Sequence, residues 1–365
     1  MAWRRAQHTL AVFSGTGAVL FCGGALYFRR KTAAPRWQHQ YRLEGKKIVV
    51  TGGTSGIGKA CVRQLKRHGA HVIVGGRDVE RRDRLASELA SDGTHGKVDV
   101  LPLDLADASS VAAFAARVES LCAGSLHGLI NNAAVIECEQ QMTAAGIDRT
   151  FATNVLGPFQ LTNSLLPLLL KTGGAGEDGQ HARIVNVGSR LDSRGWVEPS
   201  TLLNTGLMFE EPTGSPKATP MIVYASSKLC TSLLTAETYR RLRGQHVDCV
   251  CVSPGMVDTS LWRNYPLWYR VITWPFRRFY LRTPDEAASG VVFALAAPFQ
   301  AEWGGQLVSD GNVIGRSRKT QEEQLGKDLW AACEKLVAAN VALSISLSLS
   351  TPATNGRARP YEDAK

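Results

Sequence analysis

Tyr224 and Lys228, in the segment Tyr224-Ala-Ser-Ser-Lys228, are the residues whose types and spacing could do chemistry most directly. Residues four positions apart share one face of a helix, and 223–242 is predicted to be helical. A free phenol has a pKa of about 10 and is a poor base at neutral pH. Because a neighbouring ammonium stabilises the phenolate, we expect Lys228 to lower the pKa of Tyr224 and let it exchange a proton with an alcohol. Taken alone, a pair at this spacing is more often a surface contact.

A glycine-rich turn predicts a bound ligand beside which that pair could act. The turn Thr51–Gly58 (TGGTSGIG) follows the strand-like Lys47–Val50 and precedes the amphipathic Lys59–His68. Its glycines permit close approach of the backbone to a pyrophosphate, and the helix N-terminus adds N–H groups and a positive dipole end. Such a turn alone is a weak signal, but the strand–turn–helix context makes a dinucleotide site the stronger interpretation.

Short β-branched runs alternate with helical patterns along the body of the chain. The expected strands are 47–50, 71–74, 97–103, 128–131, 183–187 and 247–252. The helical patterns between them are 59–68, 79–90, 111–121, 144–170 and 223–242. Repeated units of this kind need a parallel sheet covered by helices on both faces, with ligands beyond the carboxyl ends of the strands. We therefore predict an α/β fold, a doubly wound parallel sheet of the Rossmann type, as one catalytic domain over 45–315.

The motifs in that domain resemble, in order, those of the short-chain dehydrogenase/reductase family. They are the TGxxxGxG turn, Asn131-Asn132-Ala133-Ala134 where the family usually has NNAG, Asn154 in TNVLGPF, Ser189, the YxxxK pair, and Pro254-Gly255 with Thr259 beyond it. We expect hydride to move to or from a nicotinamide while Tyr224 transfers the alcohol proton and Ser189 hydrogen-bonds the substrate oxygen. The cationic nicotinamide ring, like Lys228, is expected to stabilise the phenolate and lower the Tyr224 pKa. The resemblance implies that Asn154 holds a water linking Lys228 to solvent. The predicted catalytic residues are therefore Tyr224, Lys228, Ser189 and Asn154.

Dinucleotide contacts follow from the turn and from the same resemblance. The predicted residues are Gly52, Thr54, Ser55, Gly56, Ile57, Gly58, Arg77, Asp104, Leu105, Asn131, Ala133, Tyr224, Lys228, Pro254, Gly255, Val257 and Thr259. At the end of the second strand, a carboxylate would suit the ribose 2′-OH of NAD and a cation the 2′-phosphate of NADP. Arg77 stands there, and its planar fork suits phosphate, whereas Asp78 is interpreted as a helix cap. We predict NADP(H), with NAD(H) the less favoured alternative.

The amino-terminal end differs from the body in charge and hydropathy. Residues 1–40 carry six of the cations behind the net charge of +10 and no Asp or Glu, so the remainder is nearly balanced and nucleic-acid binding is not expected. Leu10–Phe28 is uncharged for nineteen residues, close to a bilayer-spanning length. A cleaved signal peptide or a core helix fits less well, so we predict a membrane anchor over 1–31, with a tilted or peripheral anchor left open, and a linker over 32–44.

The eight scattered cysteines and the lack of any Asn-x-Ser/Thr acceptor favour a cytosolic catalytic domain. We therefore expect a single-pass protein, in the membrane of the endoplasmic reticulum.

Aromatic residues are concentrated where the resemblance places a substrate lid, 257–283. Eight of them lie within Leu261–Leu281, with four arginines interleaved. Rings and cations suit a membrane interface, and packing of the lid on its own domain is an equal alternative. Either arrangement predicts an apolar neighbourhood for Tyr224. The long insertion Arg190–Pro220 is expected to cover the site.

Four further features resemble the membrane-anchored retinol dehydrogenase-like branch. They are the anchor, the insertion before the tyrosine, the segment Arg282-Thr-Pro-Asp-Glu286 and a closing helix over 316–340. Residues 341–365 are predicted to be a low-complexity tail, with one edge strand as the alternative.

These features predict an NADP(H)-dependent oxidoreductase that interconverts a lipophilic alcohol, such as a retinoid, sterol or polyprenol, and its aldehyde or ketone. The alternative is a non-catalytic dinucleotide-binding scaffold at a membrane, which would have no need of an activated phenol. A sugar-nucleotide epimerase would favour a TGxxGxxG loop and a nucleotide-sugar domain, and neither is evident. The histidines show no metal-ligand spacing, so no metal is predicted. A homo-oligomer is left open.

Overall fold

The computed structural model describes residues 41–91, 93–174, 181–208, 219–257, 281–314 and 318–350, and for 343–350 it describes the backbone alone. The expected anchor Leu10–Phe28, most of the expected lid and Thr259 lie outside these residues. Within these ranges, no helix is both long enough and apolar enough to cross a bilayer.

One sheet of eight strands organises the described part of the chain, in the order β3-β2-β1-β4-β5-β6-β7-β8. All neighbours pair in parallel except β7 and β8, which are antiparallel. The strands are β1 (Lys47–Thr51), β2 (His71–Gly76), β3 (Lys97–Pro102), β4 (Gly128–Asn131), β5 (Ala182–Val187), β6 (Val247–Val252), β7 (Leu307–Ser309) and β8 (Asn312–Val313). The predicted α/β fold with a parallel sheet is confirmed for the sheet as a whole, and the antiparallel β8 is the exception. The short β7 and β8 were not predicted from the sequence.

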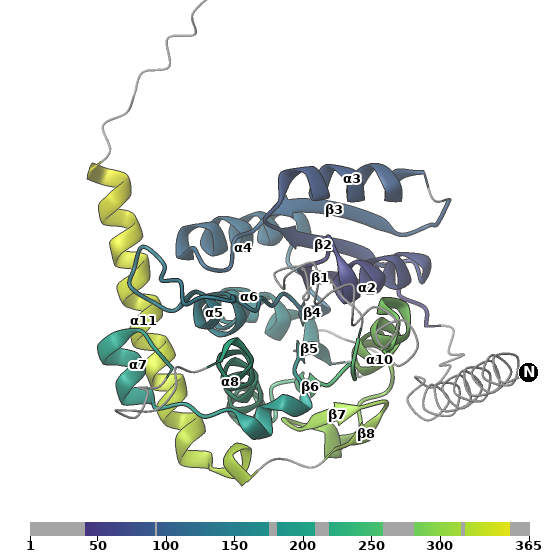
Figure 1. The fold of residues 1–365 in the computed structure, drawn as a ribbon. Helices are drawn as coiled ribbons and strands as arrows, with labels where there is room; N and C mark the ends of the chain where they lie inside the picture. The colour runs from purple at the N-terminus through teal and green to yellow at the C-terminus, as the bar shows by residue number, and fades with distance from the viewer. Residues whose placement is uncertain are drawn as a thin grey trace, which may run out of the picture.

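Helices cover both faces of this sheet (Figure 1). On one face lie α2 (Gly56–Arg67), α3 (Val79–Ala90) and α10 (Pro284–Ala296). On the other lie α4 (Ala108–Cys122), α6 (Gly157–Gly174) and α8 (Pro220–Arg241). Two shorter helices, α5 (Arg149–Phe151) and α7 (Pro199–Thr205), and the long α11 (Glu323–Ser350) pack outside α8. This layering follows from the parallel pairing, since each crossover must return over a face of the sheet.

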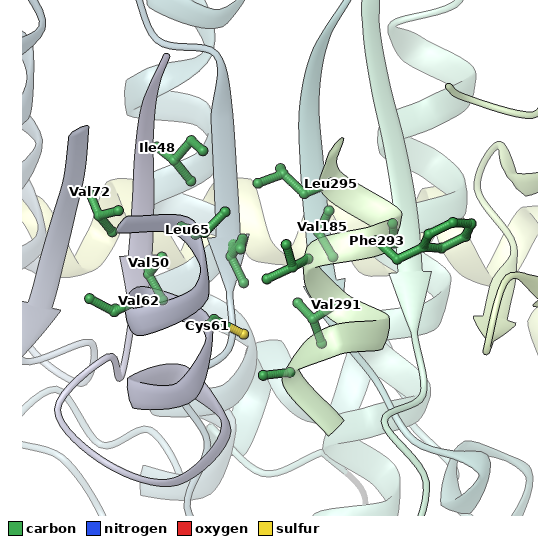
Figure 2. Packing of buried hydrophobic residues seen from close by; sticks show 14 of the residues in the cluster. Ile48, Val50, Cys61, Val62, Leu65, Val72, Val185, Val291, Phe293 and Leu295 are labelled. Carbon is green, nitrogen blue, oxygen red and sulfur yellow. The ribbon is translucent and has the colours of Figure 1, made fainter. Parts of the chain in front are cut away.

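The core between α2 and α10 fixes the position of α2 in the amino-terminal strand–turn–helix unit. Figure 2 shows the inward residues of α2, among them Cys61 and Leu65, on the side of the cluster that faces Val291 and Leu295 of α10. Leu65 and Val291 are fully buried. Burial of a side chain of this size contributes ~2 kcal/mol, so the position of α2 under the glycine-rich turn is strongly specified.

Two expected helix boundaries are corrected by the structure: the start at 144 and the end at 340. The helical pattern predicted from 144 starts at Arg149, because Gly146 has a φ of +70° and Met142 pairs with Asp148 in a short hairpin.

The helix predicted to end at 340 continues as α11 to Ser350, through residues expected to form a tail or an edge strand. Extending a nucleated helix costs little, and this sequence has no Gly or Pro between Ala338 and Pro352 to stop it earlier.

Candidate active site

The turn between β1 and α2 is built for a ligand that approaches the backbone. Gly52 and Gly56 have φ values of +65° and +53°, which favour glycine. A Cβ at Gly58 would overlap the carbonyl oxygen of Gly52 and the side chain of Asn132. Ser55 is the N-cap of α2, and its side chain makes no capping hydrogen bond. The N-terminus of α2 is therefore arranged as an anion site at the end of β1.

A cavity of about 690 Å³ runs along the carboxyl ends of the strands from this turn. Of the predicted cofactor residues, those that line it are Gly52, Thr54, Ser55, Gly56, Ile57, Arg77, Asp104, Leu105, Ala133, Tyr224, Lys228 and Pro254. Gly58, Asn131, Gly255 and Val257 lie behind or beside its wall. Its volume is typical of a small-molecule site, and its lining of a glycine turn, a helix N-terminus and arginines fits a dinucleotide.

Tyr224 and Lys228 lie on α8, whose N-terminus is capped by the Thr219 hydroxyl. Both are buried, and both line the cavity. The Lys228 Nζ donates a hydrogen bond of 2.7 Å to the carbonyl oxygen of Val187 and lies 5.5 Å from the centre of the Tyr224 ring. Tyr224 and Lys228 therefore share one face of α8, as predicted.

The direction of the Tyr224 pKa shift differs from the expectation. Burial raises the pKa of Tyr224 above its usual value of 10, and burial lowers the pKa of Lys228 to about 8. Removal of the phenolate from water outweighs the attraction of an amine that is held against a backbone carbonyl. The protein groups alone therefore do not lower the Tyr224 pKa, which corrects the part of the expectation that concerned Lys228.

Asn154 makes its hydrogen bonds to α8 and to the segment after β4, and it does not line the cavity. It lies in a π-helical turn, Ala152–Leu156, between α5 and α6. Its side chain accepts from the N–H of Val135 at 2.8 Å and donates to the hydroxyl of Ser227 at 3.0 Å. That hydroxyl donates to the carbonyl oxygen of Tyr224 at 2.7 Å. Asn154 thus connects the segment after β4 to the backbone of the tyrosine.

Ser189 lies at the end of β5, one residue beyond Gly188, which lines the cavity. Its hydroxyl accepts from the N–H of Leu191 at 3.2 Å and caps the 3₁₀ turn Arg190–Arg194, the start of the predicted insertion. Asn131 makes hydrogen bonds to Thr162 and Asn186, and it lines a separate cavity of about 40 Å³. Ser189, Asn154 and Asn131 therefore lie around the large cavity without lining it.

The cavity also contains residues that the sequence did not indicate. Arg81 lines it beside Arg77, and Asp78 caps α3, as expected, by accepting from the Arg81 N–H at 3.0 Å. Glu137, Gln141, Arg149 and Thr153 form another part of the wall. Arg149 and Thr153 are four residues apart on adjoining helical turns, which was the available signal, but their exposure to the cavity depends on the hairpin before α5.

The family comparisons agree with this geometry. A family model described as short chain dehydrogenase matches residues 46–200. Retinol dehydrogenase 14 of Mus musculus is 32% identical over 353 residues, covering 90% of this chain and 99% of its own length. The chain belongs to the short-chain dehydrogenase family. It is an oxidoreductase of the retinol dehydrogenase-like branch, as the motifs predicted.

Two further relatives of this short-chain dehydrogenase extend the comparison. The polyprenol dehydrogenase of Mus musculus is 33% identical over 297 residues, covering 81% of this chain and 84% of that protein. A solved structure of a short chain dehydrogenase/reductase family protein has a TM-score of 0.53 at 27% identity, covering 73% of this chain and 96% of that chain. No cluster of three or more potential metal ligands occurs among the described residues of this enzyme.

Proposed function

We propose that this enzyme transfers hydride between NADP(H) and a lipophilic alcohol/carbonyl pair, with Tyr224 as the proton-transfer residue. The observation that carries the proposal is that Tyr224 and Lys228 line the same cavity as the N-terminus of α2. One cavity can therefore hold a pyrophosphate at one end and present a phenol at the other. The nicotinamide supplies the hydride and, when oxidised, a positive charge.

The residues around Tyr224 have separate roles in this proposal. Lys228, anchored on Val187, stabilises the phenolate by its charge and is aligned with the ring. Ser189 does not itself line the cavity, but it follows Gly188, which does, and in this proposal its hydroxyl hydrogen turns to the substrate oxygen while its oxygen accepts from Leu191. Asn154 aligns the Tyr224 backbone through Ser227 and holds a water of the proton path. Each of these groups stabilises the transition state, in which the proton and the hydride are both being transferred.

The preference for NADP(H) is supported by Arg77, which follows β2, and by Arg81 in the first turn of α3. Arg77 and Arg81 both line the cavity there, and the Asp78 carboxylate is turned to the α3 backbone and to Arg81. A 2′-phosphate would meet two guanidinium groups, whereas a ribose 2′-OH would lack an unshared carboxylate partner.

The lipophilic substrate is supported by the names of the relatives, which are dehydrogenases of retinol and polyprenol. The apolar run Leu10–Phe28 and the aromatic segment Leu261–Leu281 suit a substrate that enters from a bilayer. We propose a single-pass anchor in the endoplasmic reticulum membrane with the catalytic domain on the cytosolic side.

The test is hydride transfer by the full chain in detergent, with NADPH or NADH, to all-trans-retinal, a sterol ketone and a polyprenal. We expect NADPH oxidation with at least one of them and its loss, by at least 100-fold, in Tyr224→Phe. Tyr239→Phe is the matched control, because Tyr239 lies on the same helix but packs against Phe299 at 6.5 Å, outside the cavity. Unchanged activity in Tyr224→Phe would exclude the mechanism. Dinucleotide binding without turnover of any carbonyl would favour the scaffold instead.

A further inference from the structure

Arg282 follows the segment beyond β6 and makes a bidentate ion pair with Asp310. Its Nη1 and Nη2 donate to the two carboxylate oxygens of Asp310, at 2.8 and 2.7 Å. The side chains are 10% and 24% exposed, so the pair is largely removed from solvent. A bidentate guanidinium–carboxylate pair fixes orientation as well as distance, because two parallel hydrogen bonds resist rotation. Asp310 lies between β7 and β8, so this edge hairpin holds the guanidinium in place.

The held guanidinium supports the turn that follows β6. Its Nη1 also donates to the carbonyl oxygen of Pro254 at 3.3 Å, and Pro254 lines the cavity. The backbone N–H of Arg282 donates to the carbonyl oxygen of Met256 at 2.8 Å, and Val257 forms a bridge with Arg282. Gly255 has a φ of +82°, and a Cβ there would lie 3.1–3.2 Å from the guanidinium. The turn therefore lies directly against Arg282.

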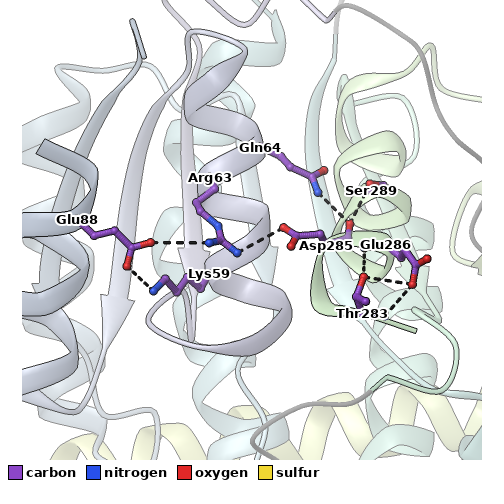
Figure 3. Close-up of polar contacts among 8 residues, drawn as sticks. All are labelled: Lys59, Arg63, Gln64, Glu88, Thr283, Asp285, Glu286 and Ser289. Atoms are coloured by element: carbon purple, nitrogen blue, oxygen red, sulfur yellow. Dashed lines mark hydrogen bonds and ion pairs between the residues drawn. The ribbon is translucent and has the colours of Figure 1, made fainter. Parts of the chain in front are cut away.

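The residues just after Arg282 contact α2, the helix that begins at the glycine-rich turn. Thr283 and Glu286 form a capping box that starts α10. Figure 3 shows Asp285 beside α2, where its carboxylate meets Arg63 at 3.4 Å and its carbonyl oxygen accepts from Gln64 at 2.9 Å. Five consecutive residues, 282–286, thus touch both the turn after β6 and the helix whose N-terminus faces the pyrophosphate position.

We propose that Arg282 is a positioning residue for the dinucleotide: held by Asp310, it fixes the turn 254–256 through the carbonyl oxygen of Pro254. Asp285, three residues later, attaches the same segment to helix α2, so the segment relates the turn to that helix. This inference rests on the dinucleotide site of the proposed function and concerns how that site is held together. A displacement of about 1 Å in such a wall is enough to weaken alignment of reacting groups. Loss of the guanidinium therefore raises the dissociation constant of the dinucleotide and lowers kcat together.

The experiment compares Arg282→Met, Arg282→Lys and Asp310→Asn with the wild-type full chain. The dissociation constant for NADPH is measured by fluorescence titration without substrate, and thermal unfolding is followed in parallel. We expect Arg282→Met to raise the dissociation constant at least 10-fold. Arg282→Lys and Asp310→Asn should raise it about threefold, because each retains one hydrogen bond of the pair.

Arg183→Lys is the matched control for a general loss of stability. Arg183 is also buried, pairs with Asp248, and donates to three backbone carbonyl oxygens at 2.7–2.9 Å, but it lies in β5 outside the cavity lining. We expect this variant to unfold at a lower temperature and to bind NADPH with the wild-type dissociation constant.

The outcomes separate this inference from the proposed function. If the Arg282 and Asp310 variants melt earlier but bind NADPH as tightly as the wild type, Arg282 has only a structural role and the inference is overturned. If Arg282→Met does not fold, Arg282→Lys and Asp310→Asn decide by the same criterion. A wild-type chain that binds neither NADPH nor NADH overturns both proposals. Normal binding by the wild type without turnover of any carbonyl overturns only the proposed activity.

Discussion

The amine of Lys228 lies 5.5 Å from the centre of the Tyr224 ring and is held there by a hydrogen bond of 2.7 Å to the carbonyl oxygen of Val187. The pair is thereby attached to β5 as well as to its own helix. Both groups are buried, which disfavours the charged form of each. The positive charge of an oxidised nicotinamide would favour the phenolate, so the phenol is best suited to proton transfer when the dinucleotide is bound.

Lys228 should make the stability of the dinucleotide-free protein depend on pH in the alkaline range. Its pKa is lowered from 10.5 to about 8, so between these values the unfolded chain holds a proton that the folded chain has released. The free energy of unfolding should therefore rise with pH across this window, by up to about 3 kcal/mol from this residue. Lys228→Met should be more stable than the wild type at pH 7 and lose this rise. Urea unfolding at pH 7 and 10 measures it, and parallel slopes in the two proteins would contradict the prediction.

Gly58→Ala should damage the glycine-rich turn. The added methyl group would overlap the Gly52 carbonyl oxygen and the Asn132 side chain, which come from two different segments of the turn wall. We expect a loss of about 1–3 kcal/mol in the free energy of unfolding and at least 10-fold weaker NADPH binding. Gly174→Ala is the control, since no atom lies within 4 Å of its added Cβ. Calorimetric titration of both variants checks the difference, and equal affinities would argue against the assigned role of the turn.

His127 should limit stability in acid. Burial lowers its pKa from 6.5 to about 4, and its Nδ1 accepts from the backbone N–H of Lys47 at 3.1 Å. Between these values the unfolded chain takes up a proton that the folded chain refuses, so stability should fall as pH falls from 6.5 to 4. The loss should be on the order of 1–3 kcal/mol. His127→Gln should remove this loss of stability in acid, whereas substitution of the exposed His95 by Gln should leave the loss unchanged. Chemical denaturation at pH 7 and 4.5 compares the three proteins.

Asp192→Ala should slow catalysis by detaching from α8 the 3₁₀ turn that Ser189 caps. The Asp192 carboxylate accepts from the Ser232 hydroxyl of α8 at 2.9 Å, and its backbone N–H donates to the Ser189 carbonyl oxygen at 3.1 Å. Its side chain is buried, so the variant leaves the Ser232 hydroxyl without this partner, at a cost of about 1–3 kcal/mol.

For Asp192→Ala we expect kcat to fall about 10-fold, with a smaller change in KM for the carbonyl substrate. The neighbouring, exposed Ser193→Ala is the control. A lower melting temperature with unchanged kcat would show that Asp192 does not position Ser189.

Some features of the site follow from local sequence. Tyr224 and Lys228 face the same way because α-helical spacing requires it, and the glycine turn lies between β1 and α2 as predicted. Asp78 caps α3 because a carboxylate at that position reaches the first free N–H groups. The parallel sheet follows from the alternation of strands and helices along the chain.

Other features depend on contacts between residues far apart in the chain. Arg282 and Asp310 are separated by 28 positions, and no periodicity relates them. Arg149 and Glu137 enter the cavity wall because the hairpin at Met142 and Asp148 brings them there, with an ion pair of 3.6 Å.

The amino-acid sequence by itself determined the family and the parallel α/β architecture and indicated the residues proposed for proton transfer, because each depends on spacing within a single strand, turn or helix. Only the tertiary structure decided which of these side chains share a cavity, which are held behind it, and in which direction burial shifts the pKa values of Tyr224 and Lys228. The reason is physical: desolvation and the geometry of long-range pairs arise from the packing of distant segments, which local spacing does not contain.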